Sequence, residues 1–297
     1  MKNRIFISGS SGFVGVNLVK YLDNIYNLDK YQKNSDIKLN HEIVIHLAGK
    51  AHDIKNISSS NDYYQVNTEL TKDIFDAFLE SNSKVFITLS SVKAVADEVD
   101  GELTEDFIPN PITHYGKSKL LAEQYILSQV IPDGKRVYIL RPCMIHGPGN
   151  KGNLNLLYSL VSKGFPWPLG SFINSRSYLS IENLCFIIKE LIDREDIPSG
   201  VYNVADDVPL PTNEVIKMIA ASKGKKARIL YLSQNLIKLL SCVGDSLKLP
   251  LNSERLQKLT ESYVVSNAKI KTALGKPLPV SSKEGLMRTF QSFANNV

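Results

Sequence analysis

A tyrosine and a lysine four positions apart, Tyr115 and Lys119, could carry proton-transfer chemistry. At helical spacing the two side chains share one face. A phenol with a pKa near ~10 is a poor base at neutral pH, but a neighbouring ammonium favours its phenolate form. Such a pair can take a proton from an alcohol, or give one to a ketone, while a hydride moves at the same carbon. The pair predicts acid–base catalysis only if its surroundings agree, because this spacing is common by chance.

The residues before the pair supply such surroundings. Residues 84–89 form an apolar run typical of a buried strand, and Ser90 and Ser91 follow it directly. A serine hydroxyl at a strand tip can hydrogen-bond the same substrate oxygen as the phenol. We therefore expect one of these serines to share a site with Tyr115 and Lys119.

A glycine-rich turn, Gly9, Gly12 and Gly15, lies between the first strand pattern and a helix pattern. The first glycine permits a tight turn, the second lets the backbone approach a pyrophosphate, and the third lets helix and strand pack closely. The helix N-terminus would then present free N–H groups to a phosphate. The spacing is GxxGxxG, and its context predicts a dinucleotide site. A purely structural turn is the alternative.

The stretch 21–40 should read the adenosine end of such a dinucleotide. Residues 25–28 are expected to form a short second strand. Asp29 could then meet the ribose, and Lys30 or Lys33 could meet a 2′-phosphate; solvated loop charges are an equal interpretation of all three. Too few residues remain for both a helix and another strand, so this side of the site should be abbreviated.

Strand and helix patterns alternate through the first half of the chain. We expect strands at 4–7, 42–47, 84–89 and 136–140, and helices at 13–22, 62–80 and 115–129. This alternation predicts an α/β fold, a doubly wound parallel sheet with right-handed crossovers.

The pattern changes after Pro142, where glycine and proline cluster through 147–170. We expect a smaller C-terminal lobe that closes over the carboxyl edge of the sheet, where ligands bind in this architecture. The first domain is predicted at 1–145, with segments from about 177–205 returning to it, and the substrate-binding lobe mainly at 146–297.

Composition narrows the class of protein. The chain has 297 residues, of which 43% are hydrophobic and 22% charged, so collagen-like and wholly disordered proteins are excluded. A net charge of +5 without a basic stripe argues against nucleic-acid binding. No signal peptide or membrane-spanning run is present, and we expect a cytoplasmic protein.

Cysteine and histidine give no sign of a metal site. The three cysteines are Cys143, Cys185 and Cys242, too far apart for a CxxC motif, and we expect them to be small buried residues. The five histidines form no HExxH motif or ligand-like cluster.

Several motifs occur together in a characteristic order. They are the glycine turn with Phe13-Val14, then His46-Leu47-Ala48-Gly49, then Ser90-Ser91, then Tyr115-Gly116-Lys117-Ser118-Lys119. Together they resemble the extended short-chain dehydrogenase/reductases, in particular the NAD-dependent nucleotide-sugar epimerase/dehydratase family. The resemblance covers nearly the whole chain and is weaker after Pro209. It implies a Rossmann-like fold, NAD or NADP as cofactor, and a homodimer formed through helices 62–80 and 115–129.

The resemblance also implies roles for individual residues. The catalytic residues would be Ser91, Tyr115 and Lys119. Cofactor-binding residues would be Gly9, Ser11, Gly12, Phe13, Val14, Gly15, Leu47, Ala48, Gly49 and Asn67, with Tyr115 and Lys119. The substrate would contact Ser91, Asn153 and Arg176, the last two at its nucleotide diphosphate. A surface arginine is the alternative interpretation of Arg176.

Two departures from the family pattern bear on the reaction. Val92-Lys93 stands where 4,6-dehydratases carry Asp-Glu, which argues against that elimination. The short 21–40 stretch favours a cofactor that exchanges at every turnover, as a reductase requires. Residues 141–153 also look like reductases that make UDP-N-acetyl-6-deoxyhexosamines.

The predicted function is therefore oxidation–reduction at C4 of a UDP-sugar, in the synthesis of surface-polysaccharide precursors. The leading reaction is reduction of a UDP-4-keto-6-deoxy-N-acetylhexosamine. The alternatives are a UDP-hexose 4-epimerase with tightly bound NAD and, more remotely, a non-catalytic NAD(P) sensor.

Overall fold

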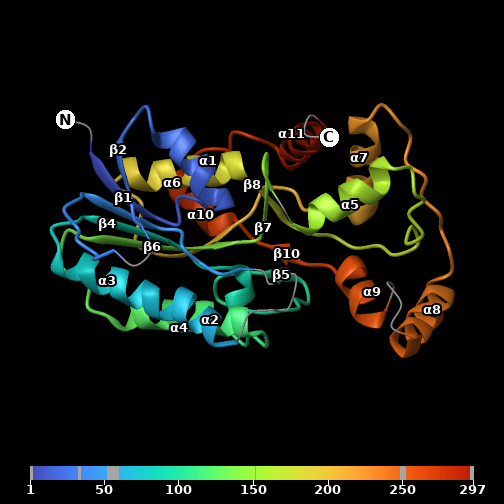
Figure 1. The fold of residues 1–297 in the computed structure, drawn as a ribbon, viewed down its shortest axis with the longest axis horizontal. Coiled ribbons are helices and arrows are strands. Elements are labelled where there is room, and N and C mark those ends of the chain that lie inside the picture. The colour runs from blue at the N-terminus through green and yellow to red at the C-terminus, as the bar shows by residue number, and fades with distance from the viewer. Residues whose placement is uncertain (1–2, 33–34, 52–59, 151, 248–251, 295–297) are drawn as a thin grey trace.

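A six-stranded parallel sheet organises the first part of the chain (Figure 1). The computed structural model describes residues 3–32, 35–51, 60–150, 152–247 and 252–294. The strands are β1 (Arg4–Ser8), β2 (Asn27–Lys30), β3 (Ile43–His46), β4 (Val85–Leu89), β6 (Arg136–Pro142) and β9 (Gly200–Val204), in the order β2-β1-β3-β4-β6-β9. All five pairings are parallel, which confirms the predicted doubly wound α/β fold.

Helices cover both faces of this sheet. On one face lie α1 (Phe13–Leu22), α6 (Ile181–Asp193) and α10 (Ala268–Leu274), and on the other lie α3 (Leu70–Glu80) and α4 (His114–Ser128) (Figure 1). Strands β3 and β4 are buried at every position, as a sheet covered on both sides requires. Their continuous apolar sequences therefore follow from their position in the centre of the sheet.

The helix predicted at 62–80 is not one regular helix. It begins earlier, as α2 (Ser60–Tyr64), and passes through a π-helical turn, η1 (Gln65–Glu69), before α3. The apolar spacing alone cannot distinguish this turn, because a single π turn leaves the amphipathic pattern on either side intact. Such turns occur frequently at functional sites, and this one carries Asn67.

The segment between α1 and β3 contributes one short strand, β2, to the edge of the sheet, as predicted. Strand β2 begins two residues later than expected, and the described residues between it and β3 form neither a helix nor a strand. The usual six-stranded order of such folds places a further strand outside this one. Here β2 is itself the edge, so the adenosine side of the sheet is trimmed.

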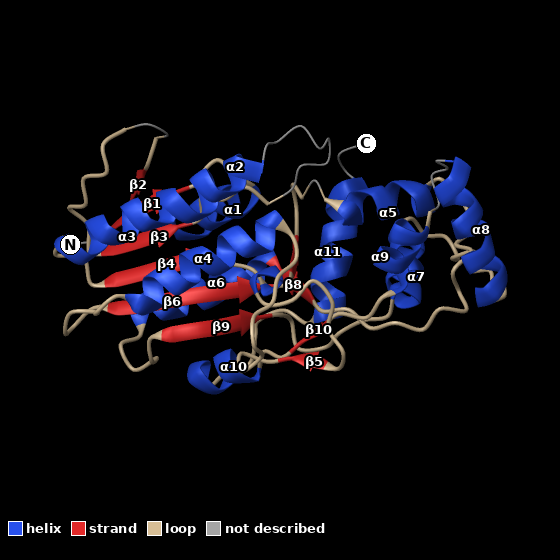
Figure 2. Ribbon diagram, turned by 90° about the horizontal axis from the view of Figure 1, so that it is seen from below, coloured by secondary structure: helices blue, strands red, loops and turns tan. Residues whose placement is uncertain are grey.

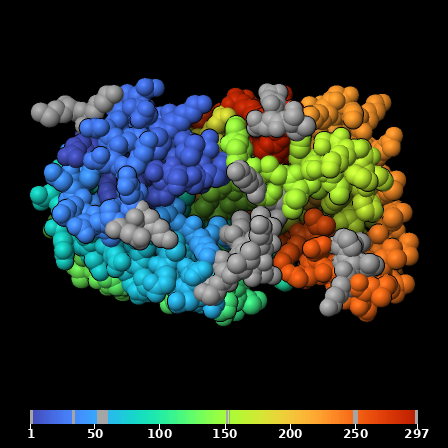
Figure 3. All heavy atoms as spheres, viewed as in Figure 1, coloured from blue at the N-terminus to red at the C-terminus, as the bar shows by residue number. Residues whose placement is uncertain are grey.

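A second core, distinct from the two on the faces of the sheet, holds the C-terminal lobe together. It is built around Trp167, Ile219 and Phe290. The lobe contains α5 (Asn153–Ser162), α7 (Thr212–Ser222), α8 (Gln234–Leu247), α9 (Ser253–Thr260) and α11 (Ser282–Ala294) (Figure 2). The space-filling view shows the blue-to-cyan N-terminal part and the C-terminal lobe at opposite ends of the molecule (Figure 3).

Two small parallel pairs of strands connect the lobes. One joins β7 (Met144–His146) to β8 (Tyr178–Ser180), and the other joins β5 (Glu102–Leu103) to β10 (Val264–Val265). Over the described ranges, no helix is both long and apolar enough to cross a membrane.

The prediction for the cysteines is correct for two of the three. Cys143 and Cys185 are buried, but Cys242 is exposed on α8. The physical reason is that α8 is covered by the protein on one side only, and Cys242 lies at the margin of that contact, with its Sγ 3.9 Å from the Ser253 hydroxyl at the start of α9.

Candidate functional site

The glycine turn brings β1 close to the end of β3. Gly9 has a φ of +73°, and a Cβ there would lie 2.5 Å from the backbone nitrogen of Ala48. A Cβ at Gly15 would lie 2.2 Å from the carbonyl oxygen of Gly9. Neither position can hold a side chain without moving backbone, so both glycines are required by the turn itself.

Gly12 differs because the space above it is open. A Cβ at Gly12 would meet only the Gly9 carbonyl oxygen, at 3.4 Å. Gly12 is also the N-cap of α1, and no side chain caps the helix there. The first N–H groups of α1 are thus available to a phosphate. This open cradle fits the pyrophosphate of a nicotinamide dinucleotide.

The neighbouring cofactor-site residues have two kinds of environment. Ser11 is exposed in the turn, whereas Phe13 and Val14 are partly buried against the core under the sheet. Leu47 and Ala48 directly follow β3 and are half-buried. The structure therefore places all of these residues around the carboxyl ends of β1 and β3.

A buried histidine, which the sequence analysis did not single out, fixes this edge. His46 Nδ1 lies 2.6 Å from Ser8 Oγ on β1, and its Nε2 lies 2.9 Å from Thr71 Oγ1 on α3. Burial, with a smaller contribution from Lys119, lowers the pKa of His46 to about 3, so the ring is neutral. The imidazole connects β1, β3 and α3 by hydrogen bonds, without a charge of its own.

Three predicted site residues meet beside this edge. A Cβ at Gly49 would lie 3.0 Å from Lys119 Nζ and 3.2 Å from Asn67 Oδ1. The Asn67 amide is fully buried, and it bonds the backbone of Lys50 on both sides, at 2.8 and 3.0 Å, and the hydroxyl of Ser118 at 3.0 Å. Asn67 therefore holds the Gly49–Lys50 backbone against α4.

Of the three residues predicted to act together, the serine and the tyrosine converge, and the lysine follows the tyrosine by four positions on α4. Ser91 precedes the short 3₁₀ helix η2 (Val92–Ala94), where its hydroxyl accepts a hydrogen bond from the Lys93 N–H. Tyr115 lies in the first turn of α4, which Thr113 caps through the N–H of Gly116. The Ser91 hydroxyl is within hydrogen-bonding reach of the Tyr115 phenol.

Burial sets the protonation of this group. It raises the pKa of Tyr115, an effect that the hydrogen bond from Ser91 opposes. Burial also lowers the pKa of Lys119 to about 8, against the attraction of the Glu123 carboxylate. In the protein without ligand the phenol therefore carries its proton at neutral pH and can donate it.

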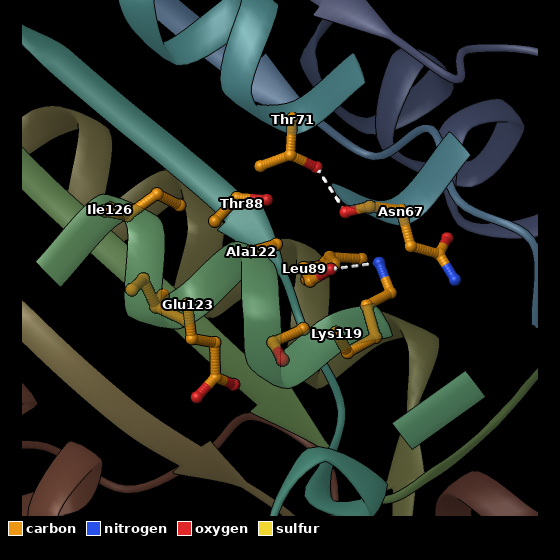
Figure 4. A pocket seen from close by; sticks show the side chains of 10 residues that line it. Asn67, Thr71, Thr88, Leu89, Lys119, Ala122, Glu123 and Ile126 are labelled. Carbon is orange, nitrogen blue, oxygen red and sulfur yellow. Dashed lines mark hydrogen bonds between the residues drawn. The ribbon is translucent and has the colours of Figure 1, made fainter. Parts of the chain in front are cut away.

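A small cavity lies behind the lysine, between α4, η1 and β4 (Figure 4). It holds about 10 Å³, enough for about one water molecule. In the close-up, the Lys119 ammonium points toward the Leu89 carbonyl, while the Glu123 carboxylate points the other way. Ser90 Oγ also lines this cavity and has no hydrogen-bond partner in the described structure. Ser90 thus faces the rear of the site.

Glu123 is held by an ion pair that the sequence analysis missed. Its carboxylate accepts hydrogen bonds from two nitrogens of Arg141, with Oε1 at 3.0 Å from Nε, and both side chains are almost completely buried. The sequence did carry a signal for this pair, because an acid and a base 18 positions apart, Glu123 and Arg141, stand among apolar residues of a helix and a strand.

The predicted diphosphate-binding residues lie in the C-terminal lobe. Arg176 donates to the carbonyl oxygen of Lys258 at 2.6 Å and pairs with Glu261 at 3.4 Å. Glu261 was not predicted, because it is 85 positions away in the sequence. Asn153 is the first residue of α5. In the described part of the chain, the side chain of Arg176 contacts Lys258 and Glu261 rather than the predicted catalytic residues.

The adenosine-side residues are only partly described. The Asp29 carboxylate pairs with Arg4 at 3.0 Å and with His41 at 2.7 Å, so it already has two partners within the protein. Lys30 is exposed at the end of β2. Lys33 lies outside the described residues.

Val92-Lys93 occupies the place where a dehydratase would need two acids. Val92 is buried, and Lys93 Nζ donates to the carbonyl oxygen of Asp97 at 2.6 Å. The same ammonium lies 4.1 Å from the centre of the Tyr263 ring. Neither residue offers a carboxyl group to a substrate.

Known proteins similar to this chain over nearly its whole length include two sugar 4-epimerases. The chain is 32% identical to a UDP-glucose 4-epimerase of Vibrio cholerae, over 100% of this chain and 98% of that protein. It is 27% identical to an N-acetyl-alpha-D-glucosaminyl-diphospho-ditrans,octacis-undecaprenol 4-epimerase of Escherichia coli O157:H7, over 98% of this chain and 95% of that protein.

A solved structure shares the fold across the whole chain. It is RMD from Pseudomonas aeruginosa complexed with NADPH, with a TM-score of 0.77 at 22% identity, covering 100% of this chain and 99% of that one. The sequence model of the NAD dependent epimerase/dehydratase family matches residues 5–205. The chain therefore belongs to the NAD dependent epimerase/dehydratase family, among the extended short-chain dehydrogenase/reductases, whose cofactor is NAD or NADP.

Proposed function

We propose that this enzyme reduces the 4-keto group of a UDP-4-keto-6-deoxy-N-acetylhexosamine, in the synthesis of surface-polysaccharide precursors. The observation that carries the choice of reduction is the trimmed sheet, which ends at β2 on the adenosine side. Fewer adenosine contacts favour release of the dinucleotide, and a reductase must release it at every turnover. An epimerase gains by retaining it, because the hydride that it removes must return.

The proposed catalytic residues are Ser91, Tyr115 and Lys119. Tyr115 donates its proton to the 4-keto oxygen, and Ser91 hydrogen-bonds the same oxygen. Lys119 provides the positive charge that stabilises the phenolate left behind. The reduced cofactor, when bound, supplies the hydride to C4. A buried, protonated phenol suits this direction, since its first task is to give up a proton.

The proposed cofactor site extends from the glycine turn to Asn67. The N–H groups at the start of α1 would bind the pyrophosphate, with Gly12 leaving room for it. Lys119 would hydrogen-bond the nicotinamide ribose beside Gly49. Asn67 would act by holding the Gly49–Lys50 backbone in place, since its own amide is already fully bonded.

The substrate diphosphate is proposed to bind at Arg176 and Asn153. A guanidinium has the charge and the forked geometry that a diphosphate requires. Arg176 is 19% exposed and paired with Glu261, so substrate would have to replace or extend that pair. We propose that residues 146–297 form most of the substrate-binding lobe, and both residues belong to this part of the chain.

A second candidate is 4-epimerisation of a UDP-hexose, with NAD retained between turnovers. The names of the two relatives, both 4-epimerases, favour this reaction. It would use the same serine, tyrosine and lysine. The third hypothesis, a non-catalytic NAD(P) sensor, has no specific support, because the chain retains Ser91, Tyr115 and Lys119, the first two within hydrogen-bonding reach of each other.

We further propose a cytoplasmic homodimer. A groove of about 350 Å³ runs along η1, α3 and α4, lined in part by Tyr64, Leu121 and Tyr125. Leu121 is 44% exposed there. Two copies that pack these helices together would cover this surface with a four-helix contact.

The experiment that tests the function is an assay of cofactor consumption. Purified protein is incubated with NADH or NADPH and a UDP-4-keto-6-deoxy-N-acetylhexosamine, and both absorbance and sugar product are followed. We expect one cofactor oxidised for each sugar reduced, and little nucleotide copurifying with the protein. Firmly bound NAD, with C4 epimers of a UDP-hexose interconverting without added reductant, would establish the epimerase instead.

A further inference from the structure

Helix α8 turns its largest apolar side chains to solvent. Five of them form one stripe, at positions 3, 4, 7 and 11 after the first, and each is between 44% and 65% exposed: Leu236, Leu239, Leu240, Val243 and Leu247. At 100° per residue this spacing keeps the five within about 100° of the helix surface. We call these five residues the α8 stripe.

The side of α8 that the protein does cover is made of smaller groups. Ile237, Ser241 and Gly244 are buried, and the helix packs against α9. The contact within the chain therefore uses one isoleucine and two small residues, while four leucines and one valine remain 44% to 65% exposed. Among the described residues, contacts within the chain do not cover this stripe, and exposed apolar patches of this kind mark interaction surfaces.

The segment that leads into α8 is strongly basic. Residues 223–233, which we call the basic segment, contain Lys223, Lys225, Lys226 and Arg228 and no acidic residue, a charge of +4. On α8 itself, the charge of Lys238 is balanced by that of Asp245. The whole chain has a net charge of +5. Within the described structure, Lys225, Lys226, Arg228 and Lys238 form no ion pair. Their charge is thus available to an external anion.

The basic segment is held next to α8 rather than hanging free. Backbone pairing of Trp167 with Ile229 and of Leu169 with Tyr231 fixes it to the lobe. Leu230 and Tyr231, which are 43% and 68% exposed, extend the apolar surface between the basic residues and the helix. Helix α8 lies at one end of the long axis of the molecule, whereas α1 and the sheet lie in the other half (Figures 1 and 2).

An anionic bilayer surface would match both the exposed apolar stripe of α8 and the positive charge of the basic segment. An amphipathic helix on a bilayer inserts its apolar side about 5–10 Å, and nearby lysines and arginines are attracted to acidic headgroups. A second copy of this chain packed against α8 would instead bring two basic segments of +4 near each other, which charge repulsion opposes.

We propose that the α8 stripe and the basic segment 223–233 dock this enzyme on the surface of an anionic phospholipid bilayer. The helix lies in the plane of the headgroups and the C-terminal lobe faces the membrane. The glycine turn and α1, in the other half of the molecule, remain open to the aqueous phase. This proposal concerns a surface separate from the catalytic residues and holds whichever sugar the enzyme uses.

Vesicle flotation of the full-length protein tests the proposal. Vesicles of phosphatidylcholine with phosphatidylglycerol are compared with vesicles of phosphatidylcholine alone. We expect wild-type protein to float with the anionic vesicles and to remain at the bottom with the neutral ones. Salt at about 1 M, where the Debye length is about 3 Å, should release most of it.

Two double variants separate the apolar contribution from the charge. Leu239→Ser/Leu247→Ser should weaken binding to anionic vesicles by about tenfold or more, since two leucines no longer enter the bilayer. Lys225→Glu/Lys226→Glu should weaken it by a similar factor, because two attractions become repulsions. All four side chains are outside the proposed catalytic and ligand sites.

Matched controls lie at other surfaces. Ile108→Ser/Val130→Ser changes two aliphatic residues that are 87% and 89% exposed, and Lys20→Glu/Lys84→Glu changes two exposed lysines far along the chain from α8. Both controls should float as wild type does. The single tryptophan, Trp167, is buried beside the basic segment, so its fluorescence during unfolding verifies that each variant retains the folded lobe.

The outcomes decide between a membrane and the other possible occupant. The proposal is overturned if wild-type protein fails to float with anionic vesicles, or if the folded α8 variants float as well as wild type. It is also overturned if sedimentation shows a dimer that Leu239→Ser/Leu247→Ser abolishes while no vesicles are bound. Activity without vesicles should be equal in all four variants, so failure of this proposal is distinguishable from failure of the proposed reaction.

Discussion

The ammonium nitrogen of Lys119 lies 2.8 Å from the carbonyl oxygen of Leu89, at the carboxyl end of β4. This bond directs a nearly buried charge toward the proposed catalytic edge of the sheet, beside Gly49 and Asn67. The charge is unfavourable for folding, since burial lowers the pKa of Lys119 from 10.5 to about 8. The burial of Lys119 is therefore unlike that of a residue selected for stability, and it agrees with the catalytic role that we propose for it.

Replacement of this lysine should separate stability from activity. The gap between a pKa of 10.5 and one of about 8 corresponds to about 3 kcal/mol of burial cost, and the lost bond to Leu89 offsets about 1 kcal/mol of it. Lys119→Met should thus be as stable as wild type or more stable at pH 7, as measured by urea unfolding, and should lose at least ~100-fold in turnover.

The pH dependence has a definite sign. Because the folded-state pKa is depressed, the unfolded chain binds more protons between about pH 8 and 10.5. The cost of Lys119 is fully present below about pH 8 and disappears as the pH rises toward 10.5. The stability advantage of Lys119→Met should shrink over that interval; an advantage that grows with pH would contradict the assigned burial.

Removal of the Tyr115 hydroxyl tests the proton donor. Tyr115→Phe should retain the fold and cofactor binding, because α4 is capped by Thr113 and the ring remains. Turnover should fall at least ~100-fold, the usual scale for a lost acid–base group. The measurement is steady-state kinetics together with a cofactor titration, and near-normal turnover would exclude the mechanism.

Two glycines in the same turn provide a matched pair. Gly12 has a φ of −74°, which alanine adopts readily, and its Cβ would have room. Gly12→Ala should therefore fold with a change in unfolding free energy below about 1 kcal/mol but bind NAD(P)H at least ~10-fold more weakly, because the methyl group enters the phosphate cradle.

Gly15→Ala should show the opposite balance. Its Cβ would lie 2.2 Å from the Gly9 carbonyl oxygen, so backbone must move, at a cost of about 1–3 kcal/mol in the free energy of unfolding. Urea unfolding and cofactor titration of both variants check the pair. Equal unfolding free energies of the two variants would show that α1 has room to move away from the glycine turn and accept a side chain at Gly15.

Much of the fold could be predicted because its signals are local. Helix α1 begins and ends where predicted, since a glycine turn precedes it and its apolar spacing is regular. Strand β3 is one residue shorter than predicted at each end, and β4 begins one residue later than predicted, because their apolar runs are bounded by polar residues. The short edge at β2 followed from counting residues alone.

The parts that could not be predicted depend on contacts between distant residues. Glu261 pairs with Arg176 across 85 positions, and nothing near either residue indicates the other. The same is true of the bonds from His46 to Ser8 and Thr71. The exposure of Cys242 depends on which side of α8 meets α9, and an amphipathic pattern does not specify its partner.

The pairing of Arg176 with Glu261 leads to a prediction for substrate binding. Arg176→Ala should weaken binding of the UDP-sugar by about 1.5–3 kcal/mol, the range for hydrogen bonds to charged groups. Binding of NAD(P)H should be nearly unchanged. Glu261→Gln retains the shape of the partner but frees the guanidinium, and it should bind the UDP-sugar at least as tightly as wild type.

Isothermal titration of the two variants with each ligand checks this assignment. If Arg176→Ala leaves both affinities unchanged, the residue is a surface arginine held by Glu261. If Arg176→Ala weakens binding of the UDP-sugar and of NAD(P)H equally, Arg176 does not belong specifically to the substrate site.

The central claim is that hydride passes from an exchanging cofactor to C4 of a keto sugar. It is tested most directly with NAD(P)H deuterated at C4 of the nicotinamide and a UDP-4-keto-6-deoxy-N-acetylhexosamine, with the product examined by NMR and mass spectrometry. We expect one deuterium at C4 of the sugar for each cofactor oxidised, in every turnover. A sugar product without deuterium, formed with no net oxidation of the added cofactor, would contradict the account.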